Sequence, residues 1–287
     1  MESGYKGFLR ARDQFGLATR YIDGVLPQRE RLTAALRELA GNGAALVIAH
    51  GGQNNEAAKT VAGEFLRQQF VITQGNVAGA NLASYDVLQE QSAFLAGALA
   101  GLLTRSGTVG HMSGIRVVPG LKGRAAFADG LRATNPRARL LTNFSGNQDD
   151  TALARRVALA EIDAGADIIF TMLNAGRDGA TDACRERGVK QIGNVKDWVA
   201  AMPEVFVASA IADVGLAVFG AARDWHDGRF PAGEIRRIGL ENPEAVRLTL
   251  AATVPADAAA RIKTLQDDII AGRLRVTETY DGPEFNV

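Results

Sequence analysis

The chain has 287 residues, which is long enough for two domains or one large one. Hydrophobic residues make up 47% of it and charged residues 22%, an ordinary balance for a globular protein that excludes a disordered chain. Lys plus Arg and Asp plus Glu both number 32, so the formal net charge is zero. This disfavours a binder of the nucleic-acid backbone, which usually carries a basic excess. The single cysteine, Cys184, excludes an internal disulfide and a cysteine-rich metal site.

The sequence leaves the cellular compartment open. Its apolar stretches are shorter than the roughly 18 residues that a membrane span needs, so no direct membrane span is expected. Residues 1–6 contain neither the apolar core of a signal peptide nor a cysteine for lipid attachment. A cytoplasmic location is therefore not excluded by these residues.

Short β-branched runs alternate with longer amphipathic runs along the chain. The expected strands are 17–22, 44–49, 70–73, 81–86, 107–112, 138–143, 167–172, 189–194, 205–210 and two short ones within 235–251. The expected helices are 27–40, 55–68, 89–104, 120–134, 150–164, 177–187, 213–227 and 256–272. Strands that alternate with helices at this spacing predict an α/β protein with one mostly parallel sheet or two such sheets. Residues 43–51 resemble 165–173, which fits two equivalent halves but also any two strand–helix units.

Candidate ligand-binding residues follow from the expected strands, because ligands of open parallel sheets bind beyond the carboxyl ends of the strands. The side chains at those ends are His50, Asp86, Ser113, Asn174, Asn194, Asp197, Trp198 and Ser209. Most of them are neutral hydrogen-bonding groups, and Trp198 adds a flat apolar surface. Such a set suits a small polar ligand without a strong charge.

Enzyme interpretations find little support in the motifs. His50, His111 and His226 lack metal-ligand spacing, and the sequence has no nucleophile turn, P-loop or dinucleotide fingerprint. Asp149 and Asp150 stand at the start of an expected helix, where carboxylates act as caps. We therefore expect no catalytic residue, metal or cofactor, although a small α/β enzyme stays as a less favoured alternative.

A series of short motifs carries a family resemblance. They are 3–8 (SGYKGF), 94–101 (FLAGALAG), 107–110 (GTVG), 127–131 (FADGL), 135–136 (NP), 149–150 (DD), 164–169 (AGADII), 192–197 (IGNVKD) and 207–209 (VAS). In this order and spacing they resemble the basic membrane protein (BMP) family of substrate-binding proteins over nearly the whole chain.

The resemblance implies the fold of type I periplasmic binding proteins, in which three crossings join two doubly wound α/β lobes. The crossings would lie near 81–86, 206–210 and 231–236. One lobe would then hold residues 1–86 and 211–231, and the other residues 87–206 and 232–287. The chain starts inside the loop that follows the family's first strand, so that strand is expected to be missing.

The resemblance also implies a function, because family members capture solutes, often purine nucleosides, between their lobes for ABC importers. Tyr5 would stack on a flat ligand, Asn174, Asn194 and Asp197 would form hydrogen bonds with it, and Ser209 would lie at the hinge. The expected partners are a purine nucleoside or similar small molecule and an ABC permease, in the periplasm or cell envelope, with no nucleic acid. A ligand-sensing regulator of the same fold is the main alternative.

Two positions depart from the family's nucleoside receptors. Val195 stands where those proteins carry the first of two acids, and Ala212 stands where they carry a lysine. A clamp on ribose hydroxyls is therefore expected to be weaker here.

Overall fold

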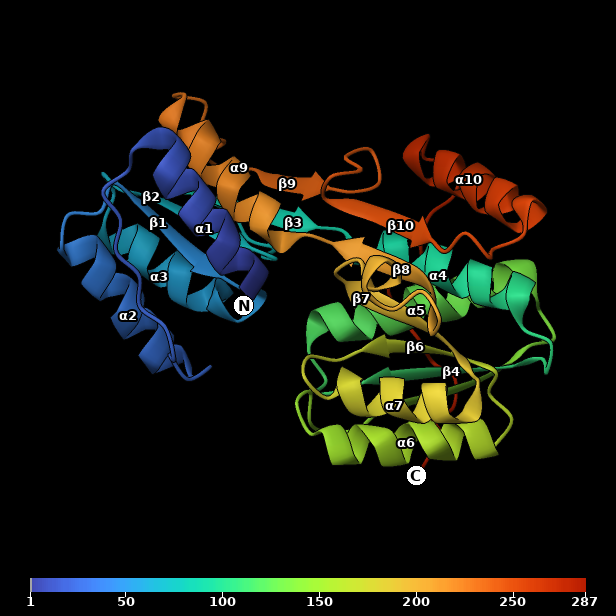
Figure 1. Cartoon of the computed structure of the whole chain (residues 1–287). Helices are drawn as coiled ribbons and strands as arrows, with labels where there is room; N and C mark the ends of the chain where they lie inside the picture. Colours follow the sequence, from blue (N-terminus) through green and yellow to red (C-terminus); the bar gives the residue numbers. More distant parts are fainter. Residues whose placement is uncertain (1) are drawn as a thin grey trace. The chain divides into compact units, whose positions relative to one another are not determined.

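The structure is a computed structural model that describes residues 2–287. The chain divides into two compact units, one made of the residues up to Val87 with Asp213–Ile238, the other of Leu88–Ala212 with Gly239–Val287. Each unit has a largely parallel sheet with helices on both faces, as Figure 1 shows. This confirms the predicted α/β class with two doubly wound sheets. The first unit extends to residue 238 instead of 231, because its last strand pairs within the first sheet.

The first unit is built around a four-stranded parallel sheet with the order β1-β2-β3-β9. Its elements are α1 (Glu2–Phe15), α2 (Arg29–Gly41), β1 (Leu46–His50), η1 (Gly52–Asn54), α3 (Asn55–Glu64), β2 (Gln69–Thr73), β3 (Leu82–Val87), α9 (Val214–His226) and β9 (Ile235–Ile238). Val47 and Ala49 pack on the face covered by α2 and α3, and Ile48 packs on the face covered by α1 and α9. This alternation is the two-residue period of a strand that is covered on both sides.

The predicted strand at 17–22 is wrong, since these residues form neither helix nor strand. A strand needs a neighbouring strand to satisfy its backbone groups. Among residues 2–287, β1 is an edge strand of the first sheet and pairs only with β2, so the segment 17–22 does not pair with it. The apolar side chains of the segment pack locally instead. Leu17 packs against the cluster of Ala11, Phe219 and Ala222, and the ring of Tyr21 lies 5.4 Å from that of Tyr5.

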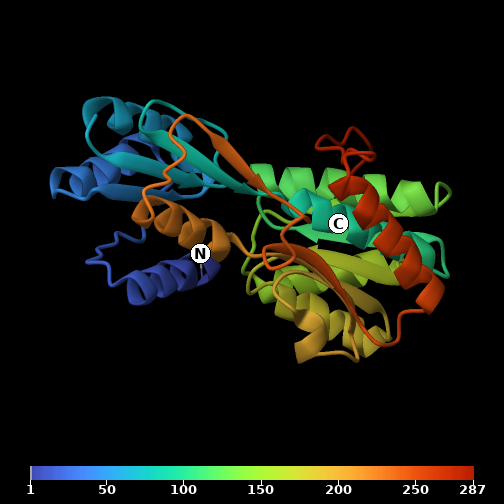
Figure 2. The ribbon, with the colours of Figure 1, turned by 90° about the horizontal axis from the view of Figure 1, so that it is seen from above.

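Helices α1 and α9 lie side by side on one face of the first sheet (Figures 1 and 2). A Cβ atom at Gly7 would overlap the carbonyl oxygen of Gly215, so the two backbones touch at this point. Asp213 caps α9 by accepting the Gly215 N–H at 2.9 Å, and the Ser3 hydroxyl donates to the same carboxylate. The start of α1 is thereby tied to the start of α9.

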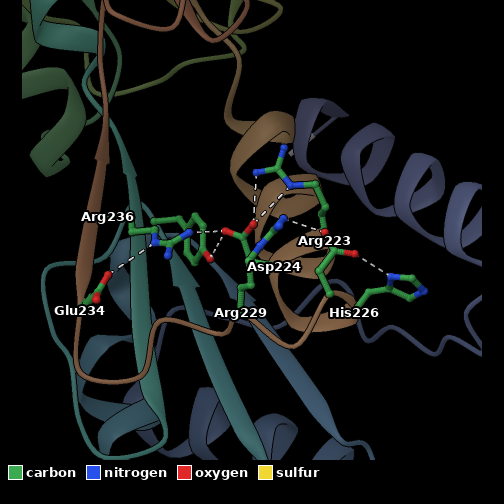
Figure 3. A network of polar contacts seen from close by, with 8 residues as sticks. Arg223, Asp224, His226, Arg229, Glu234 and Arg236 are labelled. Atoms are coloured by element: carbon green, nitrogen blue, oxygen red, sulfur yellow. Dashed lines mark hydrogen bonds and ion pairs between the residues drawn. The ribbon is translucent and has the colours of Figure 1, made fainter.

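A buried carboxylate connects three elements of the first unit (Figure 3). Asp224 of α9 is 3% exposed and accepts hydrogen bonds from the Tyr85 hydroxyl of β3 at 2.8 Å and from Arg236 of β9. Arg223 contributes a further ion pair at 3.2 Å. Burial and the neighbouring Asp224 carboxylate raise the pKa of Tyr85, so the phenol stays a donor. A buried charge is tolerated here because several donors compensate it.

The second unit contains a six-stranded sheet with the order β10-β8-β7-β6-β4-β5, in which only the pairing of β10 with β8 is antiparallel. Its helices are α4 (Gln89–Leu103), α5 (Val118–Thr134), α6 (Thr151–Asp163), α7 (Arg177–Arg187), α8 (Trp198–Ala201) and α10 (Ala256–Ile270). Its strands are β4 (Thr108–Ser113), β5 (Arg139–Phe144), β6 (Ile168–Met172), β7 (Lys190–Val195), β8 (Phe206–Ala212) and β10 (Val246–Leu250). Helices α4, α5 and α10 cover one face, and α6 and α7 cover the other (Figures 1 and 2).

Two motifs of the family resemblance meet where α4 crosses α5. A Cβ atom at Gly97 would overlap the carbonyl oxygen of Phe127, and one at Gly130 would overlap that of Phe94. The two glycines therefore allow a reciprocal contact between the helix backbones. The motifs at 94–101 and 127–131 thus act in packing.

We expect Gly97→Ala to destabilise the second unit by about 1–3 kcal/mol, because the added methyl group meets backbone atoms that have little room to move. Urea unfolding followed by circular dichroism measures the change. Gly63→Ala is the matched control, since a Cβ atom there, on α3, would meet open space. The control should be neutral or slightly stabilising, and equal destabilisation by both variants would contradict the packing argument.

Glu161 of α6 is a buried acid in the core of the second unit. It is 0% exposed, accepts a hydrogen bond from Asn143 Nδ2 at 2.8 Å, and its Oε2 atom has no partner among the described residues. Burial raises the pKa of Glu161 well above its ordinary value of 4.5, which favours the neutral acid.

Since the pKa of Glu161 is higher in the folded than in the unfolded chain, its contribution to stability is greatest below pH 4.5. The free energy of unfolding should fall by up to about 1.4 kcal/mol per pH unit above that value, and level off above the folded pKa. Glu161→Gln should remove this dependence and raise stability at neutral pH, as measured by urea unfolding from pH 4 to 8. Exposed Glu30→Gln is the control, and a wild-type slope that survives Glu161→Gln would contradict the assignment.

Candidate functional site

The carboxyl ends of β6 and β7 gather the polar and aromatic side chains of a candidate site, which we call the strand-end corner. It consists of Asn174, Arg177, Asn194, Lys196 and Trp198. Strand β6 leads through a short loop into α7, and β7 leads through a turn into α8. Since β6 and β7 are parallel neighbours, their ends place both loops at the same edge of the sheet.

Arg177 is the residue that the sequence interpretation missed. It is the first residue of α7 and is only 5% exposed. Its Nη2 atom donates to the backbone oxygen of Leu173 and to Oδ1 of Asn194, and its guanidinium carbon lies 4.3 Å from the ring centroid of Trp198. Burial lowers the pKa of Arg177 to about 10, so it remains charged at neutral pH. The sequence did contain a signal for Arg177, which is a cation in the first turn of an expected helix. A cation there is unfavourable with the helix dipole, so another interaction must favour it.

Asn194 and Trp198 are held in place by a tight turn after β7. The Asn194 carbonyl oxygen accepts hydrogen bonds from the Lys196 N–H at 2.8 Å and from the indole Nε1 of Trp198 at 2.9 Å. Val195, at the centre of this γ-turn, has φ of +69°, which is strained for a β-branched residue. A Cβ atom at Gly193 would overlap the Trp198 ring, so this glycine makes room for the indole.

Asn174 offers an available amide at the end of β6. Its side chain is exposed and forms no hydrogen bond with the described residues. Its backbone N–H donates to Gln148 and its carbonyl accepts from Arg177, so the backbone is held while the side chain is free to bind. Asn174, Asn194 and Trp198 therefore follow the ends of two neighbouring parallel strands, and their part in ligand binding stays a prediction.

Two other predicted residues of this edge serve the chain itself. Asp197 caps α8 by accepting the Ala200 N–H at 3.2 Å, and it also accepts from the Thr249 hydroxyl at 3.2 Å. The Ser209 hydroxyl is 0% exposed and accepts from the backbone N–H groups of Trp198 and Val199. Both residues therefore position α8 and Trp198.

Ser113 lies deeper than the predicted site. It is 1% exposed, and its hydroxyl is 3.4 Å from Nε2 of His111, whose Nδ1 is 2.9 Å from the Thr142 hydroxyl. Burial and the nearby Arg124 lower the pKa of His111 to about 3, so the imidazole is neutral. Ser113 belongs to the core at the end of β4.

The remaining predicted residues, Tyr5, His50 and Asp86, belong to the first unit. Tyr5 on α1 is 45% exposed, and its ring stacks on Phe8 at 5.9 Å. His50 ends β1, where its Nδ1 is 2.7 Å from the Thr73 hydroxyl, and burial lowers its pKa. Asp86 is half-buried on β3. A Cβ atom at Gly4 would touch the His50 ring, so the start of α1 packs on the end of β1.

Residues 2–287 lack two features that would point to other kinds of site. No cluster of three or more His, Cys, Asp or Glu side chains suited to a metal ion occurs in that range. No helix in the same range has the length and apolar character to cross a membrane.

Comparisons with known proteins place the chain in a family. The family model of PnrA-like ABC transporter substrate-binding proteins, named Bmp, matches residues 1–279. The transcriptional activator protein Med of Bacillus subtilis is 22% identical over 231 residues, which cover 80% of this chain and 72% of Med. The ABC transporter nucleoside-binding protein BmpA of Lactococcus lactis is 25% identical over 215 residues, or 68% of this chain and 60% of BmpA.

A solved structure supports the fold. The solute-binding protein of an ABC transporter system from Conexibacter woesei has a TM-score of 0.75 and 23% identity, with 98% of this chain and 94% of that chain covered. A likeness at this identity concerns the fold, and it agrees with the two doubly wound sheets. The family match over residues 1–279 confirms the resemblance seen in the sequence. The chain belongs to the Bmp family of ABC transporter substrate-binding proteins.

Proposed function

We propose that this protein captures a small, flat, polar ligand of the nucleoside or nucleobase class for an ABC importer, and that it does so without making or breaking a bond. The observation that carries this proposal is the strand-end corner, where two amides and an indole lie at one edge of a sheet. An indole favours a flat ring, and amides favour the donors and acceptors at its edge. The name of the lactococcal relative, a nucleoside-binding protein, points to the same class.

Each side chain has a proposed part in binding. Trp198 contacts a face or edge of the ligand ring, and Asn174 and Asn194 donate or accept hydrogen bonds at its polar edge. Tyr5 is the proposed stacking ring of the first unit. Asp197 and Ser209 act through α8, which they hold in place.

The proposed partners are a nucleoside-like solute and an ABC permease, and the proposed location is outside the cytoplasm. A balanced charge of 32 basic and 32 acidic residues supports a partner other than nucleic acid. The likeness to Med favours a second candidate, a ligand-sensing regulator on the same fold. In that case the ligand-bound protein would contact a regulatory protein instead of a permease.

Isothermal titration with inosine, adenosine, uridine and cytidine tests the proposal, with arabinose and myo-inositol as comparison ligands. We expect at least one nucleoside to bind and to be recovered unchanged by chromatography, because capture leaves its bonds intact. Binding of a sugar without binding of any nucleoside would contradict the ligand class. Conversion of a nucleoside to a product would contradict the binding function.

Asn174→Ala should weaken binding of the preferred nucleoside by about two- to tenfold, the usual value of one neutral hydrogen bond. The exposed amide makes no hydrogen bond within the described chain, so the melting temperature should not change. Asn42→Ala in the first unit is the control for affinity. This exposed amide lies outside the strand-end corner and donates to the Glu38 carbonyl at 2.8 Å, so its removal should leave the affinity at the wild-type value. Unchanged affinity in Asn174→Ala would remove this residue from the site.

A further inference from the structure

Arg177 determines which way the amide of Asn194 points. A guanidinium has five N–H donors and no acceptor, so only the oxygen of the amide can face it. The bond from Arg177 Nη2 to Asn194 Oδ1 therefore directs the Asn194 NH₂ group away from Arg177. That NH₂ group forms no hydrogen bond with any residue of 2–287.

The orientation is rigid because neighbouring contacts hold both residues. The Asn194 carbonyl oxygen is occupied by the Lys196 N–H and the Trp198 indole, so the backbone cannot turn freely. Arg177 is 5% exposed, stacks on Trp198 at 4.3 Å and is also bonded to the Leu173 carbonyl. A rotated amide would place its NH₂ group against a buried cation, so that the N–H of Arg177 that now faces Asn194 would lose its acceptor.

The groups at this end of β7 are consequently donors. Asn194 offers its NH₂ group, and the Nε of Arg177 is buried without a partner among the described residues. An asparagine that recognises an adenine edge uses its amide oxygen and nitrogen together. Here one of the two lone pairs of that oxygen already accepts from Arg177, so the oxygen is less available for that mode.

We infer that Arg177 is a positioning residue that makes the strand-end corner select ligands by a carbonyl acceptor, favouring oxo-nucleobases over their amino counterparts. This inference rests on the proposed function. An amino group in the same place would face the Asn194 NH₂ group, so that two donors would meet. The hydrogen bond would be lost and both donors would stay unpaired, which discriminates strongly between the two ligands.

Two matched pairs of nucleosides test the inference: inosine against adenosine, and uridine against cytidine. In each pair an oxo group of the first nucleoside replaces an amino group of the second, and the adjacent ring nitrogen changes from an acceptor in the amino member to an N–H donor in the oxo member. We expect the wild type to bind the oxo member of at least one pair about tenfold more tightly or better. Isothermal titration measures the ratio of the two dissociation constants within a pair.

The variants distinguish positioning from a structural role. Arg177→Met keeps an unbranched side chain against Trp198 but has no donor, so the amide is free to rotate and the ratio should approach one. Arg177→Lys keeps a cationic donor and should restore part of the preference. Asn194→Asp replaces the NH₂ group by a second carboxylate oxygen. One oxygen still accepts from Arg177, and the other is an acceptor where the wild type has a donor, so this variant should favour the amino member. Arg185→Met, an exposed residue of the same helix, is the control and should keep the wild-type ratio.

The outcomes separate this inference from the proposed function. If nucleosides bind but both members of each pair bind equally, or if Arg177→Met keeps the wild-type ratio, the inference is overturned and the proposed function stands. If Arg177→Met lowers the melting temperature and leaves the ratio unchanged, the residue is structural only and the inference is again overturned. If no nucleoside binds the wild type, the proposed function is contradicted, and the inference that rests on it is contradicted as well.

Discussion

Backbone contact between neighbouring helices is the constraint on which both units depend. A Cβ atom would collide with a facing backbone carbonyl at Gly7 in the first unit, and at Gly97 and Gly179 in the second. Each contact joins two helices on the same face of a sheet, which are α1 with α9, α4 with α5, and α6 with α7. Only glycine allows this separation, because any other residue would place a side-chain carbon inside the partner backbone. Close packing of helices then determines how each one lies on its sheet.

The same constraint reaches the candidate site. Gly179 packs against the carbonyl of Thr151 in the first turn of α7, two residues after Arg177. The start of α7 is therefore held against α6, and Arg177 is held beside the end of β7. In β7, Gly193 leaves room for the indole of Trp198. Packing glycines thus bring a cation, an amide and an indole into contact, although none of these glycines would touch a ligand.

Buried ionisable groups in the two units differ in how their charge is compensated. Asp224 is surrounded by donors from Tyr85, Arg223 and Arg236, which is the arrangement of a structural anchor. Glu161 has one amide donor, and burial raises its pKa so that the acid is neutral. Arg177 keeps its charge and forms no ion pair with a carboxylate of residues 2–287, while it stacks on an aromatic ring. A charged, buried group that is satisfied only by neutral acceptors is the one best placed to orient a binding amide.

The alternation of strands and helices was readable from the sequence, because the hydrophobic period depends on neighbouring residues alone. The same alternation located Asn174, Asn194 and Trp198 at strand ends, and the motif order identified the family. Hydrogen-bond partners were not readable, because they come from residues distant in the chain. Asp197 accepts from Thr249, 52 residues away, and Ser209 accepts from the backbone of Trp198, so both predicted ligand residues are engaged within the protein.

The segment 17–22 shows the same limit for secondary structure. Its residues have the pattern of a strand, but a strand forms only when a neighbouring strand accepts its backbone bonds, and β1 has its partner on the β2 side among residues 2–287. Arg177 shows the same limit for the candidate site. Its sequence neighbours do not reveal that its guanidinium forms a hydrogen bond with Asn194, 17 residues further on. Local pattern therefore determined the elements and the family, whereas the pairing of polar groups was decided only when the chain folded, because that pairing depends on distance in space.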